Sequence, residues 1–436
     1  MTAARRTDVV VVGGGPAGLA AANAAAALNR QVLLLDQGER LGGQIWRHRA
    51  GDTLPATARN AIAAIRPPRV AVAHRASVID CLSPTTLLVS FNGRIASVAA
   101  DSVVLATGAV ERLLPFPGWT LPGVVGVGGM QALVKVGLDV TGARVVLSGA
   151  GPLLLPVAAT LAQRGARVLL IAEQARAADV RRFARGALIG PGRMVQAVAL
   201  RWASRAAPYR TDSWVIRASG RDRLEHVVMQ VDGREVEFEC DWLAAGAGLV
   251  PRTALAQLLG CHIAQESVTV DDCQATSVPG IFAAGECCGI KGDAGAIVEG
   301  TIAGIAAAGG AIPSRLVRRR DAARRFGARM AYCFAPRREL RERIAADTII
   351  CRCEDVRFNQ IDPAWSQRQA KLWTRVGMGA CQGAVCGPAC HALFGWETNA
   401  PRPPLEQPAL AGWAAAVAAL TPEATPGPES PPGPVA

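Results

Sequence analysis

The stretch Asp8 to Asp36 reads DVVVVGGGPAGLAAANAAAALNRQVLLLD. A short apolar run leads into a glycine-rich turn, an alanine-rich segment follows, and a second apolar run ends on Asp36. Such apolar runs are typical of buried strands, and alanine-rich segments are typical of helices. The order predicts a complete β-α-β unit of the kind that binds dinucleotides.

Each part of this fingerprint has a mechanical task. Gly13 permits the tight turn, Gly15 lets the backbone approach a pyrophosphate, and Gly18 lets the helix pack close to the strand. The helix N-terminus presents free amide groups to the phosphates. Asp36 can accept hydrogen bonds from a ribose hydroxyl and would repel a 2′-phosphate. The agreement of all parts favours a nucleotide site over an accidental glycine-rich turn.

Length and composition indicate a globular protein. The chain has 436 residues, 50% of them hydrophobic, which suits about two to four domains. The net charge is +12, but the basic residues are almost all arginine. We attribute this skew to GC-rich coding bias and expect no nucleic-acid partner. The densest cluster, Arg315 to Arg343, is interpreted as a solvated helical connector rather than a docking patch for an acidic partner.

No segment is long and uninterrupted enough to span a bilayer, so no transmembrane segment is expected. Arg5 and Arg6 precede the first predicted strand rather than the apolar core of an export signal. We therefore expect a cytoplasmic protein. Twelve cysteines in a cytosolic chain favour metal or redox chemistry over a disulfide framework.

A second fingerprint begins at Arg144 and reads RVVLSGAGPLLLPVAATLAQRGARVLLIAE. Gly149 and Gly151 match, but Leu154 occupies the third glycine position. That glycine serves helix packing more than phosphate contact, so its loss weakens a nucleotide site without forbidding it. Glu173 would disfavour a 2′-phosphate. NAD binding and a purely structural domain both remain open here.

Between and after the fingerprints lie shorter signals. The segments 70–80 and 86–91 alternate and predict an antiparallel flap of short strands. Cys287 and Cys288 are adjacent, and such pairs rarely close a disulfide without strain, so we expect them to pack rather than to react. No C-x-x-C or C-x4-C pair lies where a flavin-linked disulfide reductase would need one, which disfavours thiol reductase chemistry.

Four cysteines near the end of the chain form two close pairs. Cys351 and Cys353 are separated by one residue, and Cys381 and Cys386 by four. With an intervening helical segment, these pairs suit a tetrathiolate site for an iron–sulfur cluster. Zinc is the rival metal, although C-x-C with C-x4-C departs from the usual C-x2-C pairs of zinc ribbons. Cys390 could substitute for Cys386 and is treated as a bystander. Free amides of the loop glycines can bond the sulfurs; these are Gly377, Gly379, Gly383 and Gly387.

The motifs resemble known families. The sequences GGGPAG, GGQIW, VLATGAVERLLPFPG and GIFAAGE recur in this order in flavoproteins with two dinucleotide domains, similar to glutathione and thioredoxin reductases. The cysteine segment resembles the [2Fe-2S] domain of bacterioferritin-associated ferredoxin. Together with TRVGMGACQG, this combination resembles the α (A) subunits of opine oxidases and of D-hydroxyproline or L-proline dehydrogenases, and the B subunit of hydrogen cyanide synthase. The resemblance covers about residues 8–396.

The resemblance implies an α/β fold with two dinucleotide-binding domains and a small C-terminal [2Fe-2S] domain. The implied divisions are 1–140 and 241–312 for the two parts of the FAD-binding domain, 141–240 for an inserted NAD-binding-like domain, 313–346 for the arginine-rich connector, 347–396 for the cluster domain and 397–436 for a tail rich in proline and alanine. This tail is expected to wind over a neighbour or to be disordered. The implied FAD contacts are Gly13, Gly15, Pro16, Ala17, Gly18, Asp36, Gln37, Gly43, Gln44, Val78, Ala106, Thr107, Gly108, Gly285 and Glu286. The implied cluster ligands are Cys351, Cys353, Cys381 and Cys386.

The resemblance also implies a heteromeric oxidoreductase acting on CH–NH groups. A flavin-bearing β subunit would oxidise an amine, amino acid or opine, and this chain would relay the electrons, with no catalytic base of its own. The family leaves room for a second flavin (FMN) at the subunit interface, a small γ subunit, and peripheral association with the inner membrane. Two rivals stay open, namely a self-contained NADH-dependent reductase and a non-catalytic nucleotide-binding scaffold.

Overall fold

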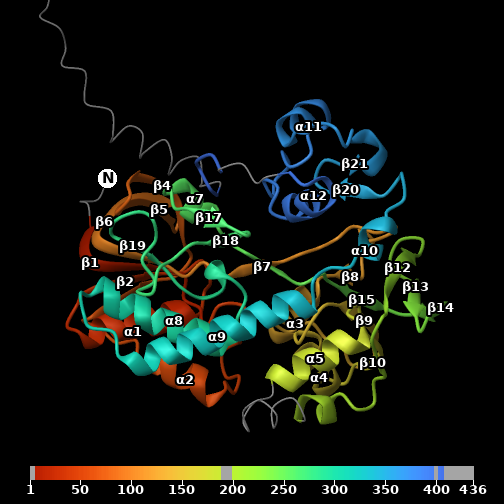
Figure 1. Cartoon of the computed structure of the whole chain (residues 1–436), viewed down its shortest axis with the longest axis horizontal. Coiled ribbons are helices and arrows are strands. Elements are labelled where there is room, and N and C mark those ends of the chain that lie inside the picture. The colour runs from red at the N-terminus through yellow and green to blue at the C-terminus, as the bar shows by residue number, and fades with distance from the viewer. Residues whose placement is uncertain (1–4, 188–198, 397–400, 407–436) are drawn as a thin grey trace, which may run out of the picture.

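The computed structural model describes residues 5–187, 199–396 and 401–406. The first unit is built on a seven-stranded sheet in the order β3-β2-β1-β6-β5-β4, with β19 paired to β6 (Figure 1). The pairs of β1 with β2 and with β6 are parallel, as the fingerprint requires. The strands are β1 (Arg5–Val12), β2 (Val32–Leu35), β3 (Val70–Ala73), β4 (Ala76–Ser83), β5 (Thr86–Phe91), β6 (Arg94–Leu105) and β19 (Ile281–Ala283).

The antiparallel flap expected over 70–80 and 86–91 was wrong in one respect. Residues 70–80 divide into two strands at Arg75, whose φ of 52° turns the chain. The first of them, β3, pairs parallel with β2 and extends the nucleotide-binding sheet. Only β4 joins β5 and β6 in the antiparallel flap.

Two helices pack unusually close beneath this sheet. Helix α1 (Pro16–Ala27) follows the glycine-rich turn, and α8 (Gly292–Ala307) crosses it. A Cβ atom added at Gly300 would lie 2.1 Å from the carbonyl oxygen of Ala17, and one at Gly304 would lie 2.2 Å from that of Ala21. Glycine at these two positions is therefore what allows the helix backbones to touch.

The second unit carries a five-stranded sheet in the order β11-β10-β9-β15-β8, flanked by a three-stranded sheet β12-β13-β14. Strands β7 (Ala109–Glu111) and β16 (Leu249–Pro251) pair antiparallel where the chain passes between the two units. The remaining strands are β8 (Val124–Val125), β9 (Arg144–Gly149), β10 (Arg167–Glu173), β11 (Tyr209–Arg210), β12 (Trp214–Ser219), β13 (His226–Val231), β14 (Arg234–Glu239) and β15 (Trp242–Ala245). Its helices are α3 (Val127–Lys135), α4 (Leu154–Gln163) and α5 (Ala177–Ala187).

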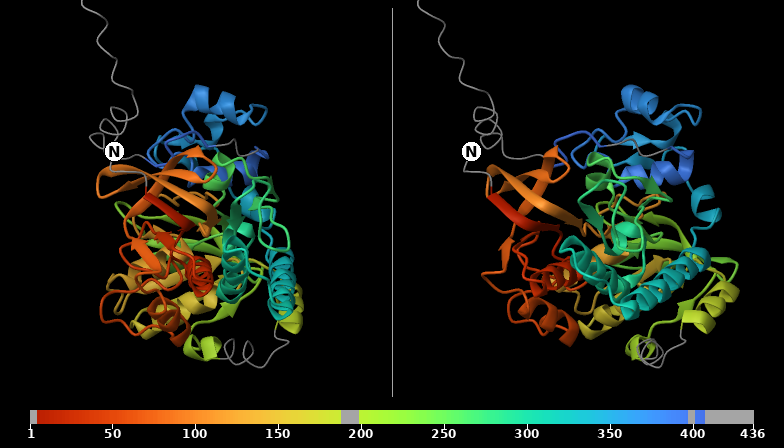
Figure 2. Two further views of the ribbon diagram at one scale, coloured as in Figure 1. Left: turned by 90° about the vertical axis from the view of Figure 1, so that its left-hand side faces the viewer. Right: turned by 60° about the vertical axis from the view of Figure 1, so that its left-hand side comes forward.

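The arginine-rich connector forms helix α9 (Ser314–Cys333) and the short α10 (Glu339–Glu342), and α9 runs along one side of the molecule from α8 to α5 (Figures 1 and 2). The helix was expected, but its solvated character was wrong in part. Arg320 is only 3% exposed and makes ion pairs with Asp272 and Asp321 at 3.0 and 2.7 Å. Arg337 likewise pairs with Asp212 at 2.5 Å. The connector is therefore attached to both units by ion pairs, at Asp272 in the first unit and at Asp212 in the second.

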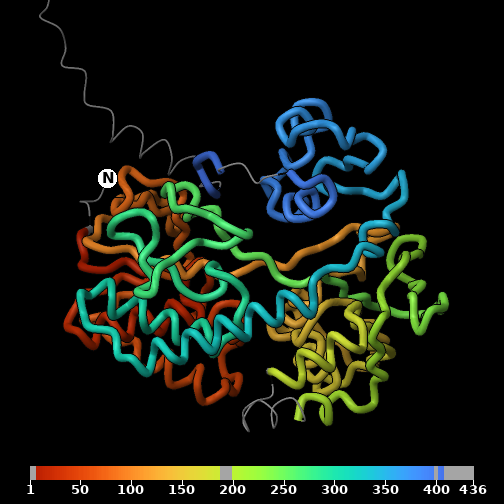
Figure 3. The backbone as a smooth tube through the Cα atoms, viewed as in Figure 1, coloured from red at the N-terminus to blue at the C-terminus, as the bar shows by residue number. Residues whose placement is uncertain are grey.

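Beyond α10 the chain enters a small C-terminal unit, which can be followed as a tube in Figure 3. It contains the hairpin of β20 (Ile349–Cys351) and β21 (Val356–Arg357), helix α11 (Gln367–Thr374) and helix α12 (Cys386–Phe394). Residues 401–406 return to the first sheet, where the Leu405 amide donates to the Ile79 carbonyl at 2.8 Å. The rest of the expected tail, 397–400 and 407–436, lies outside the described residues. Within the described ranges, no helix combines the length and apolar character that a membrane span needs.

Candidate cofactor sites

The first fingerprint forms an open cradle between β1 and α1. The Asp36 carboxylate accepts hydrogen bonds from the amides of Gly14 and Gly38, which fixes it at the end of β2. A Cβ at Gly18 would meet the Gly13 carbonyl oxygen at 1.7 Å, so this glycine is required by helix packing as expected. Above Gly15, by contrast, an added Cβ would meet only the Gly43 Cα at 3.9 Å. The space over the glycine-rich turn is therefore free for a pyrophosphate.

The loop after β2 lies beside this cradle. The Gly42 amide donates to the Gly14 carbonyl at 2.8 Å, which ties the loop to the fingerprint. Gly43 has a φ of 60° and an added Cβ would lie 3.0 Å from the Gly15 Cα, so glycine serves close approach here. Gln44 is exposed next to it. The expected contacts Gly15, Gly43 and Gln44 thus lie together.

Other expected contacts come from different strands. Ala106 follows β6, and its carbonyl oxygen would be 2.3 Å from a Cβ at Gly13. Thr107 and Gly108 continue this turn, where the Thr107 hydroxyl donates to the Arg252 carbonyl at 2.7 Å. Val78 is buried in β4. Gln37 follows Asp36, and its side chain donates to the Glu406 carboxylate of the returning C-terminal segment.

The motif GIFAAGE (residues 280–286) is held by a nearby buried ion pair that the sequence did not reveal. Gly285 has a φ of 83°, and its amide donates to the Glu299 carboxylate at 3.1 Å. Glu299 is fully buried and lies 3.0 Å from the Lys291 ammonium, which also donates to the Cys288 carbonyl. This network holds the Gly285 turn against α1, where an added Cβ would be 2.7 Å from the Ala17 Cβ. Such pairing is long-range and leaves no motif in the sequence.

Glu286 and the adjacent cysteines lie just before α8. Burial raises the pKa of the Glu286 carboxyl, although the Gly292 amide donates to it and opposes that shift. The Cys287 sulfur is buried against the carbonyls of Leu105 and Ala284, 3.8 Å from the Cys288 sulfur, and both thiols are free. This is the packing arrangement predicted for the pair.

The second fingerprint is occupied by the connector. An ideal Cβ at Gly151, the glycine expected to face a pyrophosphate, would lie 3.4 Å from the Phe334 ring. Glu173 is fully buried and accepts from the amides of Gly151 and Ala175 at 2.7 and 2.9 Å. Gln174 donates to the carbonyls of Phe334 and Ala335. The connector thus lies where the adenosine half of a dinucleotide would bind. Leu154, at the third glycine position, is buried at the start of α4.

The four C-terminal cysteines converge in one cradle. Side-chain contacts join Cys351 to Cys386 and Cys353 to Cys381. The Cys386 thiol also contacts Cys390, so the expected bystander is a direct neighbour of the site. Among the described residues, no three His, Cys, Asp or Glu side chains are grouped tightly enough to hold a single metal ion. The side-chain contacts therefore pair Cys351 with Cys386 and Cys353 with Cys381.

Two of the four loop glycines donate to these sulfurs as predicted, whereas the Gly387 amide donates to the Gly383 carbonyl instead. The Gly377 amide donates to the Cys351 sulfur, and the Gly383 amide donates to the Cys381 sulfur. A Cβ at Gly379 would lie 2.3 Å from the Cys353 Cβ. Backbone donors to thiolate sulfurs are characteristic of iron–sulfur sites, so the donor set fits such a cluster.

Similarity to known proteins agrees with this geometry. Residues 7–310 match the family described as pyridine nucleotide-disulphide oxidoreductase. The opine oxidase A chain of Agrobacterium tumefaciens (strain Ach5) is 30% identical, covering 87% of this chain and 84% of its own. The HcnB component of hydrogen cyanide synthase from Pseudomonas protegens is 31% identical, covering 87% and 90%. The fold is similar to L-proline dehydrogenase from P. horikoshii, with a TM-score of 0.65 and 18% identity over 93% of this chain and 79% of that one. Thioredoxin reductase of T. acidophilum has a TM-score of 0.55 and 22% identity over 70% and 98%.

Fold and fingerprints define an oxidoreductase with two dinucleotide-binding domains. The chain belongs to the pyridine nucleotide-disulphide oxidoreductase family and, within it, to the group that contains HcnB and the A components of opine oxidases. The resemblance to opine oxidase A subunits and HcnB and the expected α/β fold with two dinucleotide-binding domains are confirmed. The [2Fe-2S] cluster of the C-terminal unit stays a prediction. Membership of this flavoprotein family supports FAD as the ligand of the open first cradle.

Proposed function

We propose that this chain is the electron-transfer subunit of a heteromeric flavin-dependent dehydrogenase that oxidises a C–N bond of an amino acid or opine on a partner β subunit. The named relatives support this proposal, because they are subunits of opine oxidase and of hydrogen cyanide synthase. A third relative, over 38% of this chain, is the alpha chain of sarcosine oxidase from Corynebacterium. A small γ subunit, interfacial FMN, and attachment to the inner membrane surface belong to the same proposal.

The cysteine cradle is the observation that carries the relay function. A [2Fe-2S] cluster needs four thiolates shared between two irons, so two adjacent pairs suit it. Zinc is the less suitable metal, because C-x-C with C-x4-C departs from the usual C-x2-C pairs of zinc ribbons. We assign Cys351, Cys353, Cys381 and Cys386 as ligands, with Gly377 and Gly383 orienting the sulfurs by their amides.

In the first unit, the residues bind and orient FAD. The free amides at the N-terminus of α1 would face the pyrophosphate, and Asp36 would accept from a ribose hydroxyl. The half-buried Glu286 carboxyl would offer an acceptor to the ribityl hydroxyls. When bound, FAD can exchange electrons in pairs or singly, whereas a [2Fe-2S] cluster carries one at a time. A chain that holds both groups can relay electrons without any acid or base of its own.

The test compares the chain alone with its complex. The chain is purified alone and also co-expressed with the proposed flavin-bearing β subunit. Dye reduction by amines, amino acids and opines is then measured for the isolated chain and for the complex. We expect turnover only in the complex. Cys381→Ser should abolish dye reduction while substrate still bleaches the partner flavin, and the exposed Cys273→Ser serves as the control. Amine oxidation by the isolated chain would contradict the proposal.

A further inference from the structure

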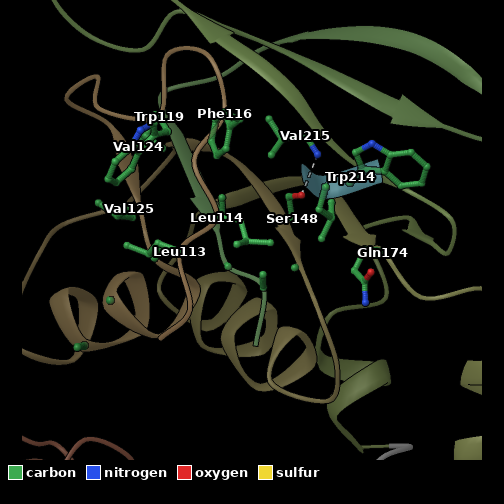
Figure 4. A pocket seen from close by; sticks show the side chains of 18 of the residues that line it. Leu113, Leu114, Phe116, Trp119, Val124, Val125, Ser148, Gln174, Trp214 and Val215 are labelled. Carbon is green, nitrogen blue, oxygen red and sulfur yellow. Dashed lines mark hydrogen bonds between the residues drawn. The ribbon is translucent and has the colours of Figure 1, made fainter. Parts of the chain in front are cut away.

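A pocket of about 410 Å³ opens at the carboxyl ends of β9 and β15 in the second unit (Figure 4). This is the switch point of the sheet, where nucleotide-binding domains hold their ligands. Its wall is mainly aliphatic and aromatic, and Figure 4 shows Leu113, Leu114, Phe116, Trp119, Val124, Val125, Trp214 and Val215 around it. Leu340 and Arg343 of the connector form one side of the pocket. Arg352, which lies between the cysteines Cys351 and Cys353, forms another side.

Three arginines line this pocket, and no Asp or Glu is among its described lining residues. Arg343 donates to the carbonyls of Val215 and Leu114, and its guanidinium lies 4.9 Å from the centre of the Phe116 ring. Its Nε atom is shielded from solvent and has no hydrogen-bond partner among the described residues, and the same holds for Arg47. Burial lowers the pKa of Arg343 to about 9. The Arg343 side chain as a whole is half-buried, but a cation whose Nε is shielded from water and has no carboxylate partner is costly, and an anion would offset that cost.

One carboxylate beside the pocket, that of Glu111, already has hydrogen-bond partners. Glu111 lies behind the pocket wall, where an added Cβ at Gly126 or Gly246 would meet it at 2.1 or 2.5 Å. It accepts from the amides of Gly128 and Gly129 at the start of α3. Glu111 is therefore held by backbone amides rather than by a pocket arginine.

The pocket is only half of an ordinary dinucleotide site. Phe334 and the Gln174 contacts fill the adenosine half. The half that remains offers few polar partners. The Ser148 hydroxyl accepts from the Val215 amide, and the Gln174 oxygen accepts from the Arg337 amide. The described lining residues include no carboxylate to accept from sugar hydroxyls, which disfavours a nucleotide.

We propose that this pocket binds a compact organic monocarboxylate with an aromatic or branched aliphatic body, its carboxylate paired with Arg343. The apolar wall takes the body, and the guanidinium takes the charge. The site is independent of the relay proposed above. A ligand bound here would contact both the connector and the cluster domain, through Arg343 and Arg352, and would stabilise the contact of the cluster domain with the second unit.

Titration of the purified full-length chain with phenylacetate tests the site, with calorimetry and quenching of Trp119 and Trp214 fluorescence as readouts. AMP and FMN are the comparison probes. We expect saturable one-to-one binding of phenylacetate and none of AMP. Arg343→Met should weaken it about tenfold or more. Arg338→Met, an exposed arginine on the same connector, should bind as the unmodified chain does.

A second variant tests the pocket independently, in case Arg343→Met does not fold. Leu133 lines the pocket and is 40% exposed, so Leu133→Trp can fill the space with little strain. It should weaken phenylacetate binding while flavin content and melting temperature stay unchanged. Tighter binding of AMP or FMN than of phenylacetate would overturn the proposal, as would no binding of any probe, or binding that neither variant alters. None of these results bears on iron content or amine oxidation, so failure here is distinct from failure of the relay.

Discussion

At the scale of single residues, the buried ion pair of Lys291 and Glu299 positions the motif GIFAAGE, through the hydrogen bond from the Gly285 amide to Glu299. Lys291→Met would leave Glu299 fully buried beside only Arg324, whose Nε lies 3.9 Å away. Breaking one side of a buried pair costs about 3–5 kcal/mol. We expect a loss of that order in unfolding free energy, measured by denaturant titration, together with lower flavin content.

Two matched variants sharpen this result. The double change Lys291→Met with Glu299→Gln removes both charges and should recover part of the loss, since no unpaired buried charge remains. Arg319→Met, on the exposed side of α9, should leave stability unchanged. If Lys291→Met behaves like Arg319→Met, the pair does not hold the motif.

Glu173 gives the second unit a pH dependence. Burial raises its pKa from 4.5 to about 7. The folded state therefore holds this proton more tightly than the unfolded chain does. The resulting stability is fully present below pH 4.5 and is lost as pH rises through 7, an effect of about 3 kcal/mol. Unfolding free energies at pH 5 and pH 8 should differ less in Glu173→Gln, and an unchanged difference would refute this role.

The roles of single residues could be predicted from the sequence where their partners lie close to them along the chain. Gly13, Gly18 and Asp36 act within one β-α-β unit, so their spacing revealed their tasks. Gly377 and Gly383 were likewise predicted beside the sulfurs, because the loop that carries them also carries the cysteines. Phe334 could not be anticipated over Gly151, because nothing in the sequence links positions so far apart along the chain. Lys291 is a lone basic residue in sequence and acquires meaning only through α8.

At the scale of elements, the contact between α1 and α8 depends on glycine. Gly304→Leu would force a side chain into the Ala21 carbonyl, and overpacking of this kind costs about 1–3 kcal/mol or more. We expect a lower melting temperature and partial loss of flavin, since α1 carries the phosphate-binding amides. Ala294→Leu, at an exposed position of α8, is the control and should melt normally. Equal melting temperatures would mean that the helices can separate freely.

The elements themselves were predicted unevenly. Apolar runs located β1, β2 and β9 because each is buried on both faces of a parallel sheet. The division at Arg75 was missed, since no glycine or proline marks that turn. The burial of α9 was also missed, because its arginines suggested solvent whereas Arg320 finds Asp272 across the fold.

At the scale of the whole molecule, the connector predicts that this chain is not a self-contained reductase. Because Phe334 lies over Gly151, we expect NADH to leave the flavin of the isolated chain oxidised in an anaerobic spectrum. Phe334→Ala removes the ring and should allow weak NAD binding. Rapid bleaching of the unmodified chain by NADH would show that the second site is open and would revive the reductase alternative.

The central claim is that a flavin and a [2Fe-2S] cluster reside on one chain, and metal analysis tests it most directly. The chain is purified anaerobically, its iron, zinc and flavin are quantified, and the dithionite-reduced sample is examined by electron paramagnetic resonance. We predict FAD with about two irons per chain and the signal of a reduced [2Fe-2S] cluster. Cys353→Ser should lose the iron and the signal while keeping the FAD. Zinc without iron, or flavin with no metal at all, would contradict the account.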